Sequence, residues 1–351
     1  MVPSSLSNSS VLHKKHLLRL LARTPLAISV FMLMAWGQTS KFTTEVNVVN
    51  VLTTVVDKNG RIVKGLTATD FRMEEDGHPQ KIEYFSQQTD LPLVIGLLVD
   101  TSGSMSRMFG EEKEASSAFF RQVLRPRTDR AYVINFDKQV TLQQKLTSSR
   151  KDLEGALARM ETRVDFRNQG AAFAPAGRST ALYDAIYSAS EAIMKKQGGR
   201  KALIVISDGM DIQSENSLED AIAAAQRAAT LVYSIRMYDP LEPSIVNWTP
   251  YDPLGSSSPD TKAHKPVSGL EAGKDALRRI SRETGASFFD VSEELSLQDV
   301  YDHIQNELRN QYNLGYRPDL SRLGPGFHRL RVETRMAGLN VQARDGYYVE
   351  K

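Results

Sequence analysis

An apolar run followed by a hydroxyl-rich turn decides the fold; it covers residues 93–104 and reads LVIGLLVDTSGS. An uninterrupted apolar run of this length is typical of a strand buried on both faces, as in a parallel sheet covered by helices. Similar runs alternate with stretches of helical spacing, which predicts an α/β fold over residues 91–312, with a doubly wound, mostly parallel six-stranded sheet flanked by helices. The expected strands are 93–99, 131–136, 140–146, 202–207, 231–237 and 287–291, and the expected helices are 107–124, 150–160, 181–197, 217–229, 272–284 and 296–311.

Segments rich in β-branched residues flank this domain on both sides. Residues 40–90 predict a small β-sheet module made of two hairpins, with turns at Asn59-Gly60 and Asp76-Gly77. Residues 313–351 predict C-terminal β-strands that close the fold. The strands expected in these two segments are 46–56, 61–63, 71–75, 80–85, 313–316, 328–334 and 340–349. Inside the α/β domain, residues 239–270 are rich in proline and serine and predict a long surface loop.

The N-terminus has the order of a signal peptide. Four basic residues, Lys14 to Arg23, precede an apolar run over 26–36 that ends in the small-x-small sequence Ala35-Trp36-Gly37. This run is shorter than the roughly 20 residues that a membrane-spanning helix needs. We therefore expect residues 1–37 to be removed near Gly37, leaving an exported protein, periplasmic or extracellular, with no stable membrane span. An uncleaved signal anchor is the alternative.

Composition narrows the functional classes. The chain has 351 residues, 41% of them hydrophobic and 25% charged, as in globular proteins. It has no cysteine, which excludes disulfides, thiolate metal sites and a cysteine nucleophile. The net charge is +2, and outside the leader 40 basic residues face 42 acidic ones, so nucleic acid is not expected as a partner.

Oxygen-bearing side chains follow the expected strands at one edge of the sheet. Asp100, Ser102 and Ser104 come directly after the buried strand 93–99, Thr180 opens a helix, and Asp208 follows the strand 202–207. Ligands of doubly wound sheets bind outside the carboxyl ends of the strands. Carboxylate and hydroxyl oxygens suit a hard cation such as Mg²⁺, Mn²⁺ or Ca²⁺ better than zinc or copper.

This constellation resembles the metal-ion-dependent adhesion site of von Willebrand factor type A domains. The resemblance covers roughly residues 91–312, and every motif position is filled. It implies that Asp100, Ser102, Ser104, Thr180 and Asp208 surround one divalent cation, with Mg²⁺ the first expectation. Two carboxylates at most neutralise the ion, so it stays electrophilic and can accept an Asp or Glu side chain of a partner protein. The whole chain is also similar to exported bacterial proteins described as VWFA-related domain proteins.

The sequence is compatible with several hypotheses of function. We expect a non-enzymatic, exported, metal-dependent binding or adhesion module. One alternative is a structural or assembly scaffold whose metal site is vestigial. Another is a Mg²⁺-dependent aspartyl hydrolase or phosphotransferase with Asp100 as nucleophile. That chemistry calls for a second carboxylate two residues later, where this chain has Ser102. The oligomeric state and the identity of the partner are not indicated.

Simpler structural roles compete with metal binding at each position. Asp100, Ser104 and Thr180 could be ordinary helix caps. Asp211 could orient a water near a metal, although a solvated loop carboxylate is the preferred interpretation. Asp137 is expected to be a turn residue.

Overall fold

The computed structural model describes residues 48–87, 91–162, 180–238, 269–319, 321–322 and 324–349. All of these described residues belong to one compact unit. The expected signal peptide and residues 239–268 of the expected surface loop lie outside the described residues.

The central sheet is the predicted one. Its strand order is β10-β9-β8-β5-β6-β7, and all neighbours are parallel except β6 and β7. Every residue of β5 and β9 is buried, as expected for inner strands of a sheet covered on both faces. The six strands lie within two residues of the predicted bounds: β5 (Leu93–Asp100), β6 (Arg130–Phe136), β7 (Val140–Thr147), β8 (Arg200–Ser207), β9 (Leu231–Arg236) and β10 (Phe288–Asp290).

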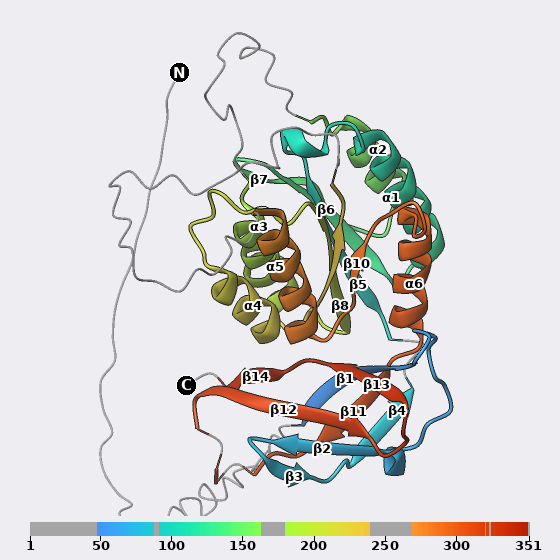
Figure 1. Ribbon diagram of the computed structural model, residues 1–351, viewed down its shortest axis with the longest axis vertical. Coiled ribbons are helices and arrows are strands. Elements are labelled where there is room, and N and C mark those ends of the chain that lie inside the picture. The colour runs from blue at the N-terminus through green and yellow to red at the C-terminus, as the bar shows by residue number, and fades with distance from the viewer. Residues whose placement is uncertain are drawn as a thin grey trace, which may run out of the picture. The chain divides into compact units, whose positions relative to one another are not determined.

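Helices cover both faces of this sheet (Figure 1). One face carries α1 (Phe109–Val123), α2 (Arg150–Arg159) and α6 (Leu297–Arg309), and the other carries α3 (Leu182–Ser188), α4 (Leu218–Arg227) and α5 (Gly269–Thr284). The helix begun by α3 continues as a π-helical turn over Ala189–Ile193 and a 3₁₀ turn over Met194–Lys196. The fold is therefore an α/β sheet flanked by helices, as predicted.

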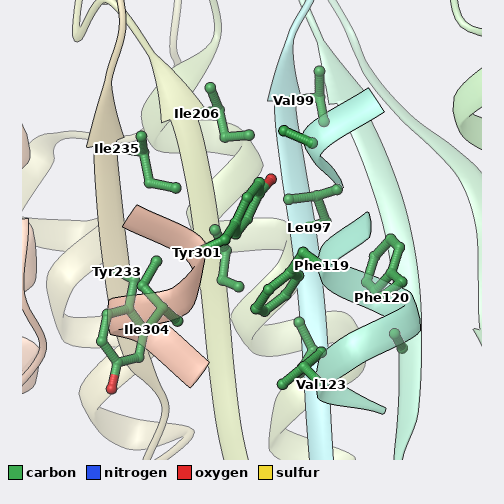
Figure 2. Packing of buried hydrophobic residues seen from close by; sticks show 14 of the residues in the cluster. Leu97, Val99, Phe119, Phe120, Val123, Ile206, Tyr233, Ile235, Tyr301 and Ile304 are labelled. Atoms are coloured by element: carbon green, nitrogen blue, oxygen red, sulfur yellow. The ribbon is translucent and has the colours of Figure 1, made fainter. Parts of the chain in front are cut away.

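Side chains of β5 alternate between the two faces and so enter two separate cores. Leu97 and its odd-numbered neighbours pack with α1 and α6, whereas Leu98 packs with α3 and α5. Figure 2 shows the first core, where the rings of Phe119 and Tyr301 stack with centroids 4.4 Å apart. The hydroxyl of Tyr301 lies 2.7 Å from Ser116 Oγ, so this buried polar group is hydrogen-bonded.

A buried carboxylate fixes the amino end of β5. Asp129 is fully buried and accepts hydrogen bonds from the Leu93 N–H (3.0 Å), the Arg125 N–H (2.9 Å) and Arg309 Nη2 (2.8 Å). Burial raises the pKa of Asp129, but the Arg125 side chain, whose Nε donates at 3.2 Å, and then these other donors lower it to about 2. The last residue of α6 is thereby joined to the first residue of β5.

The remaining strands form two sheets over a third hydrophobic core. Their orders are β13-β1-β11-β4 and β14-β12-β2-β3. Each sheet combines strands from before and after the α/β domain, so both flanking segments build a single β module. Its strands are β1 (Val49–Asp57), β2 (Phe71–Glu75), β3 (His78–Gln80), β4 (Tyr84–Gln87), β11 (Tyr312–Tyr316), β12 (Gly326–Thr334), β13 (Leu339–Ala343) and β14 (Gly346–Val349).

Three expectations about these flanking strands were wrong in detail. The expected strand at 61–63 is reduced to one bridge between Val56 and Ile62. The run 80–85 divides between β3 and β4, because the Glu83 N–H already bonds to Gly315 O in the other sheet. The run 340–349 likewise divides into β13 and β14, since the Asp345 N–H bonds to Glu283 O of the α/β domain instead of to a neighbouring strand.

Candidate metal site

Asp100 ends β5 and is fully buried. One carboxylate oxygen accepts the Ser102 N–H (2.9 Å), and the other accepts Ser207 Oγ (2.7 Å) from the end of β8. The parallel register pairs Val99 with Ile206, so the two strands end side by side. The strand pairing thus places the first predicted ligand at the carboxyl edge of the sheet.

A chain of hydrogen bonds joins three further predicted residues. Ser104 Oγ donates to Asp208 Oδ2 (2.8 Å), and Ser102 Oγ lies 3.0 Å from Ser104 Oγ. The other oxygen of Asp208 accepts the Met210 N–H (2.8 Å). A 3₁₀ turn over Gly103–Met105 shapes the loop, and the buried Met105 side chain anchors it in the core.

Thr180 belongs to the same region through its backbone. Its carbonyl accepts the N–H groups of Ile212 (3.0 Å) and Gln213 (3.3 Å), in the loop that follows Asp208. Thr180 is buried, and α3 begins after Ala181, which makes no side-chain cap. The interpretation of Thr180 as a helix cap is therefore wrong. The structure joins the other four predicted residues by hydrogen bonds and ties Thr180 to their loop.

The first turn of α3 is capped from that loop instead. Asp211 Oδ1 accepts the Tyr183 N–H (3.2 Å) and Ser214 Oγ (2.6 Å), and Ser214 Oγ accepts the Asp184 N–H (3.1 Å). Burial raises the pKa of Asp211. Asp211 is thus a half-buried structural carboxylate and not the solvated one we expected.

Two glycines bring α5 against the metal-site loop. Gly209 has a φ of +88°, in the left-handed region that favours glycine. A Cβ on Gly209 would lie 2.5 Å from the Gly273 carbonyl oxygen, and one on Gly273 would lie 2.8 Å from the Gly209 carbonyl carbon. The position of Asp208 therefore depends on close backbone contact with α5.

The cap interpretation of the first motif is also wrong. The 3₁₀ turn begins after Ser102 and α1 begins after Met108, and neither of these two residues makes a side-chain cap. Asp137, in contrast, is confirmed as a turn residue, because its carboxylate accepts the Gln139 N–H (3.0 Å).

Acidic side chains lie close together at this edge of the sheet. Burial and next the Asp208 carboxylate raise the pKa of Asp100 to about 7. Glu112 of α1 is also buried, and within the described residues neither of its carboxylate oxygens has a hydrogen-bond partner. Burial and next Asp100 raise the pKa of Glu112 well above its usual range. Within the described residues, no basic side chain forms an ion pair with Asp100 or Glu112.

The donor set fits a hard divalent cation. Two carboxylates and neighbouring hydroxyls offer only oxygen, and a cation would offset the repulsion between Asp100 and Asp208. In the described part of the chain, no group of three or more His, Asp or Glu side chains could hold a metal ion. The serine and threonine hydroxyls would therefore have to complete the coordination.

Sequence reasoning missed Ser207 and Glu112. Ser207 precedes Asp208, and a polar residue at the end of a buried strand was the available signal. Glu112 lies three residues after Phe109 and four before Ser116, both on the buried face of α1. That helical spacing could have identified Glu112 as a buried carboxylate.

Residues 95–210 match the family model of the von Willebrand factor type A domain. The chain contains a von Willebrand factor type A domain. The matched segment includes Asp100, Ser102, Ser104, Thr180 and Asp208. No curated protein matches the chain. No helix in the described ranges is long and apolar enough to cross a membrane.

Several solved structures are similar to the chain. The conserved hypothetical protein BatB from Bacteroides thetaiotaomicron is 17% identical, with 62% of this chain and 100% of that chain covered and a TM-score of 0.42. A von Willebrand factor type A protein from Catenulispora acidiphila is 11% identical, with coverages of 80% and 74% and a TM-score of 0.44. Proximal thread matrix protein 1 from the mussel byssus, with a zinc-occupied MIDAS motif, is 15% identical, with coverages of 67% and 49% and a TM-score of 0.45.

Proposed function

We propose that this chain is an exported, non-enzymatic binding module, periplasmic or extracellular, that uses a divalent cation to capture an acidic side chain of a partner protein. Asp100, Ser102, Ser104, Thr180 and Asp208 would hold the cation, with Mg²⁺ preferred and Mn²⁺ or Ca²⁺ as alternatives. The observation that carries the proposal is the hydrogen-bonded series Ser102-Ser104-Asp208 beside the buried Asp100 carboxylate.

The charge balance supports recognition of an acidic ligand. Asp100 and Asp208 would neutralise the two charges of the ion, while hydroxyl ligands add none. An ion held in this way retains affinity for an outside carboxylate, which would complete the coordination. Ser207 would act through Asp100, because its hydroxyl donates to the carboxylate oxygen and fixes its orientation.

Metal titration of the full chain tests the cation site. The chain is stripped with a chelator, exchanged into metal-free buffer and titrated calorimetrically with Mg²⁺, Mn²⁺ and Ca²⁺. We expect saturable binding that is lost in Asp208→Asn and Ser104→Ala but kept in Asp302→Asn, a control on the exposed side of α6. Saturating metal should also stabilise the fold, by about 2.7 kcal/mol at one hundred times Kd. Circular dichroism first establishes that each variant is folded.

An Asp-rich peptide tests whether the bound cation captures an acidic side chain of a partner. We expect it to bind only when Mg²⁺ is present, and not to bind the Asp208→Asn variant. Peptide or partner binding that persists without metal would contradict the proposal and favour the scaffold alternative. No saturable metal binding at about 10 mM, or equal binding in all variants, would refute the cation site.

A further inference from the structure

A second cavity lies at the opposite end of the central sheet from the metal site. Its volume is about 340 Å³, and its walls include Arg200 and Leu231, the first residues of β8 and β9. Asn50 of β1, Asn313 of β11 and Arg344 line it from the β module. We call it the seam pocket. Since β8 has eight residues, the pocket lies about 25 Å from Asp208 at the other end of that strand.

The described lining of the seam pocket is cationic. It contains the guanidinium groups of Arg200 and Arg344 and no Asp or Glu. Arg200 is buried and donates only to the carbonyl oxygens of Leu308 and Leu91, the latter at 3.3 Å. Arg344 donates to the Asn50 carbonyl oxygen (2.9 Å). Among the residues that the structure describes, the Nε atom of each arginine has no hydrogen-bond partner.

Within the described residues, neither arginine forms an ion pair with a carboxylate. Asp129, whose charge acts on Arg200, is already bound by Arg125 and Arg309. Burial and next Arg309 lower the pKa of Arg200 to about 10, so it is still charged at neutral pH. Burial also lowers the pKa of Arg344. Arg200 is buried and Arg344 half-buried, and a buried cation without a counter-charge is costly; an anion that accepts the N–H groups of both would offset that cost.

The other residues that line the pocket indicate what the uncharged part of a ligand would contact. Leu52, Leu91 and Leu231 give the pocket an apolar side, and Asn313 Oδ1 is a buried acceptor without a partner. A cavity of this size is at the lower end of the range of small-molecule sites. A planar carboxylate is the natural anionic group, because arginine binds it through paired N–H donors.

We propose that the seam pocket binds a small organic carboxylate, with its charged group against Arg344 and Arg200 and a short apolar body against the leucines. This site does not depend on the metal site. The ligand of the seam pocket differs from the proposed partner of the metal site, because it is a small molecule that binds inside a cavity. It requires no cation and is bound by guanidinium groups.

Benzoate and its uncharged analogue benzamide are suitable probes for the unmodified full chain. Calorimetric titrations are made in metal-free buffer after removal of the chelator, so that carboxylate binding to a metal does not contribute. We expect saturable benzoate binding with a Kd on the order of 1 mM and benzamide binding at least about tenfold weaker. This comparison does not depend on the folding of any variant.

Variants then locate the binding. We expect Arg344→Gln to weaken benzoate binding at least about tenfold and Arg344→Lys to retain part of it, since the charge is kept. Arg331→Gln, an exposed arginine of β12, and Asp208→Asn should both bind benzoate like the unmodified chain. Equal affinity for benzoate and benzamide, no saturation at about 20 mM, or unchanged binding in Arg344→Gln would overturn the proposal.

Discussion

Replacing Gly273 with alanine tests whether the contact between α5 and the metal-site loop controls the position of Asp208. In an unobstructed helix interior, Gly→Ala stabilises a protein by about 1 kcal/mol. At position 273, however, the new Cβ would lie 2.8 Å from the carbonyl carbon and 2.9 Å from the carbonyl oxygen of Gly209. It would also lie 3.2 Å from the backbone carbonyl oxygen of Asp208. These are backbone atoms, so no side-chain rotation can relieve the contact.

The helix-propensity gain is the same for any Gly→Ala change inside a helix, so comparison with a second such variant isolates the cost of the close backbone contact. Overpacking of this kind costs about 1–3 kcal/mol. Gly155→Ala in α2 is a matched control, because its new Cβ meets only the flexible end of Arg159, at 3.2 Å. We therefore expect Gly273→Ala to be less stable than Gly155→Ala by about 1–3 kcal/mol. If the loop yields, Mg²⁺ binding should weaken about tenfold, equivalent to about 1.4 kcal/mol.

Two measurements separate stability from binding. Urea denaturation in metal-free buffer gives the free energy of unfolding of both variants and of the unmodified chain. Calorimetric titration with Mg²⁺ then gives their affinities. The reasoning is refuted if Gly273→Ala is as stable as Gly155→Ala and binds Mg²⁺ with unchanged affinity.

Two predictions concern pH. Asp129 has a pKa of about 2 in the folded chain, below the usual 3.8. Its contribution to the free energy of unfolding is therefore present above about pH 4 and is lost as the pH falls through about 2. Asp129→Asn should lower the free energy of unfolding by about 2 kcal/mol at pH 7 and by about 1 kcal/mol at pH 3. Urea denaturation at both pH values measures this, with Asp302→Asn as a control, and a pH-independent difference would contradict it. Burial lowers the pKa of His328, but the Gly324 carbonyl and the Asp76 carboxylate, 2.8 and 2.7 Å from its ring nitrogens, raise it overall. The stabilisation by protonated His328 is therefore complete below about pH 6.5 and is lost as the pH rises through the folded pKa. The difference in free energy of unfolding between the unmodified chain and His328→Gln should shrink from pH 5.5 to pH 8.5. A constant or growing difference would contradict the raised pKa of His328.

The central domain was predictable because its signals are local. A strand buried on both faces must be apolar throughout, and residues 93–99 satisfy this without reference to any other part of the chain. Helix starts are equally local, as in the capping boxes of Ser217 with Asp220 and Ser296 with Asp299. Four of the five predicted metal-site residues meet by hydrogen bonds because the ends of neighbouring parallel strands share one edge.

The β module was less predictable because its pairing is not local. Val49 pairs with Tyr316, and Asp57 pairs with Leu339, so the partners of β1 lie in the last part of the chain. Turn residues such as Asn59-Gly60 favour a hairpin locally, but pairing with β11 and β13 buries far more of β1. A single sequence contains the turn signal and gives no direct signal of the distant partner.

The same topology separates the candidate metal site from the connections to the β module. The α/β domain lies between β4 and β11, and its first and last elements are joined through Asp129, which binds both Leu93 and Arg309. Entry to and exit from the domain therefore lie together at the amino end of β5. The metal-site residues follow the carboxyl ends of β5 and β8, one strand length away. In the described residues, both connections to the β module thus lie at the end of β5 and β8 opposite to Asp100 and Asp208, which is also the end that borders the seam pocket.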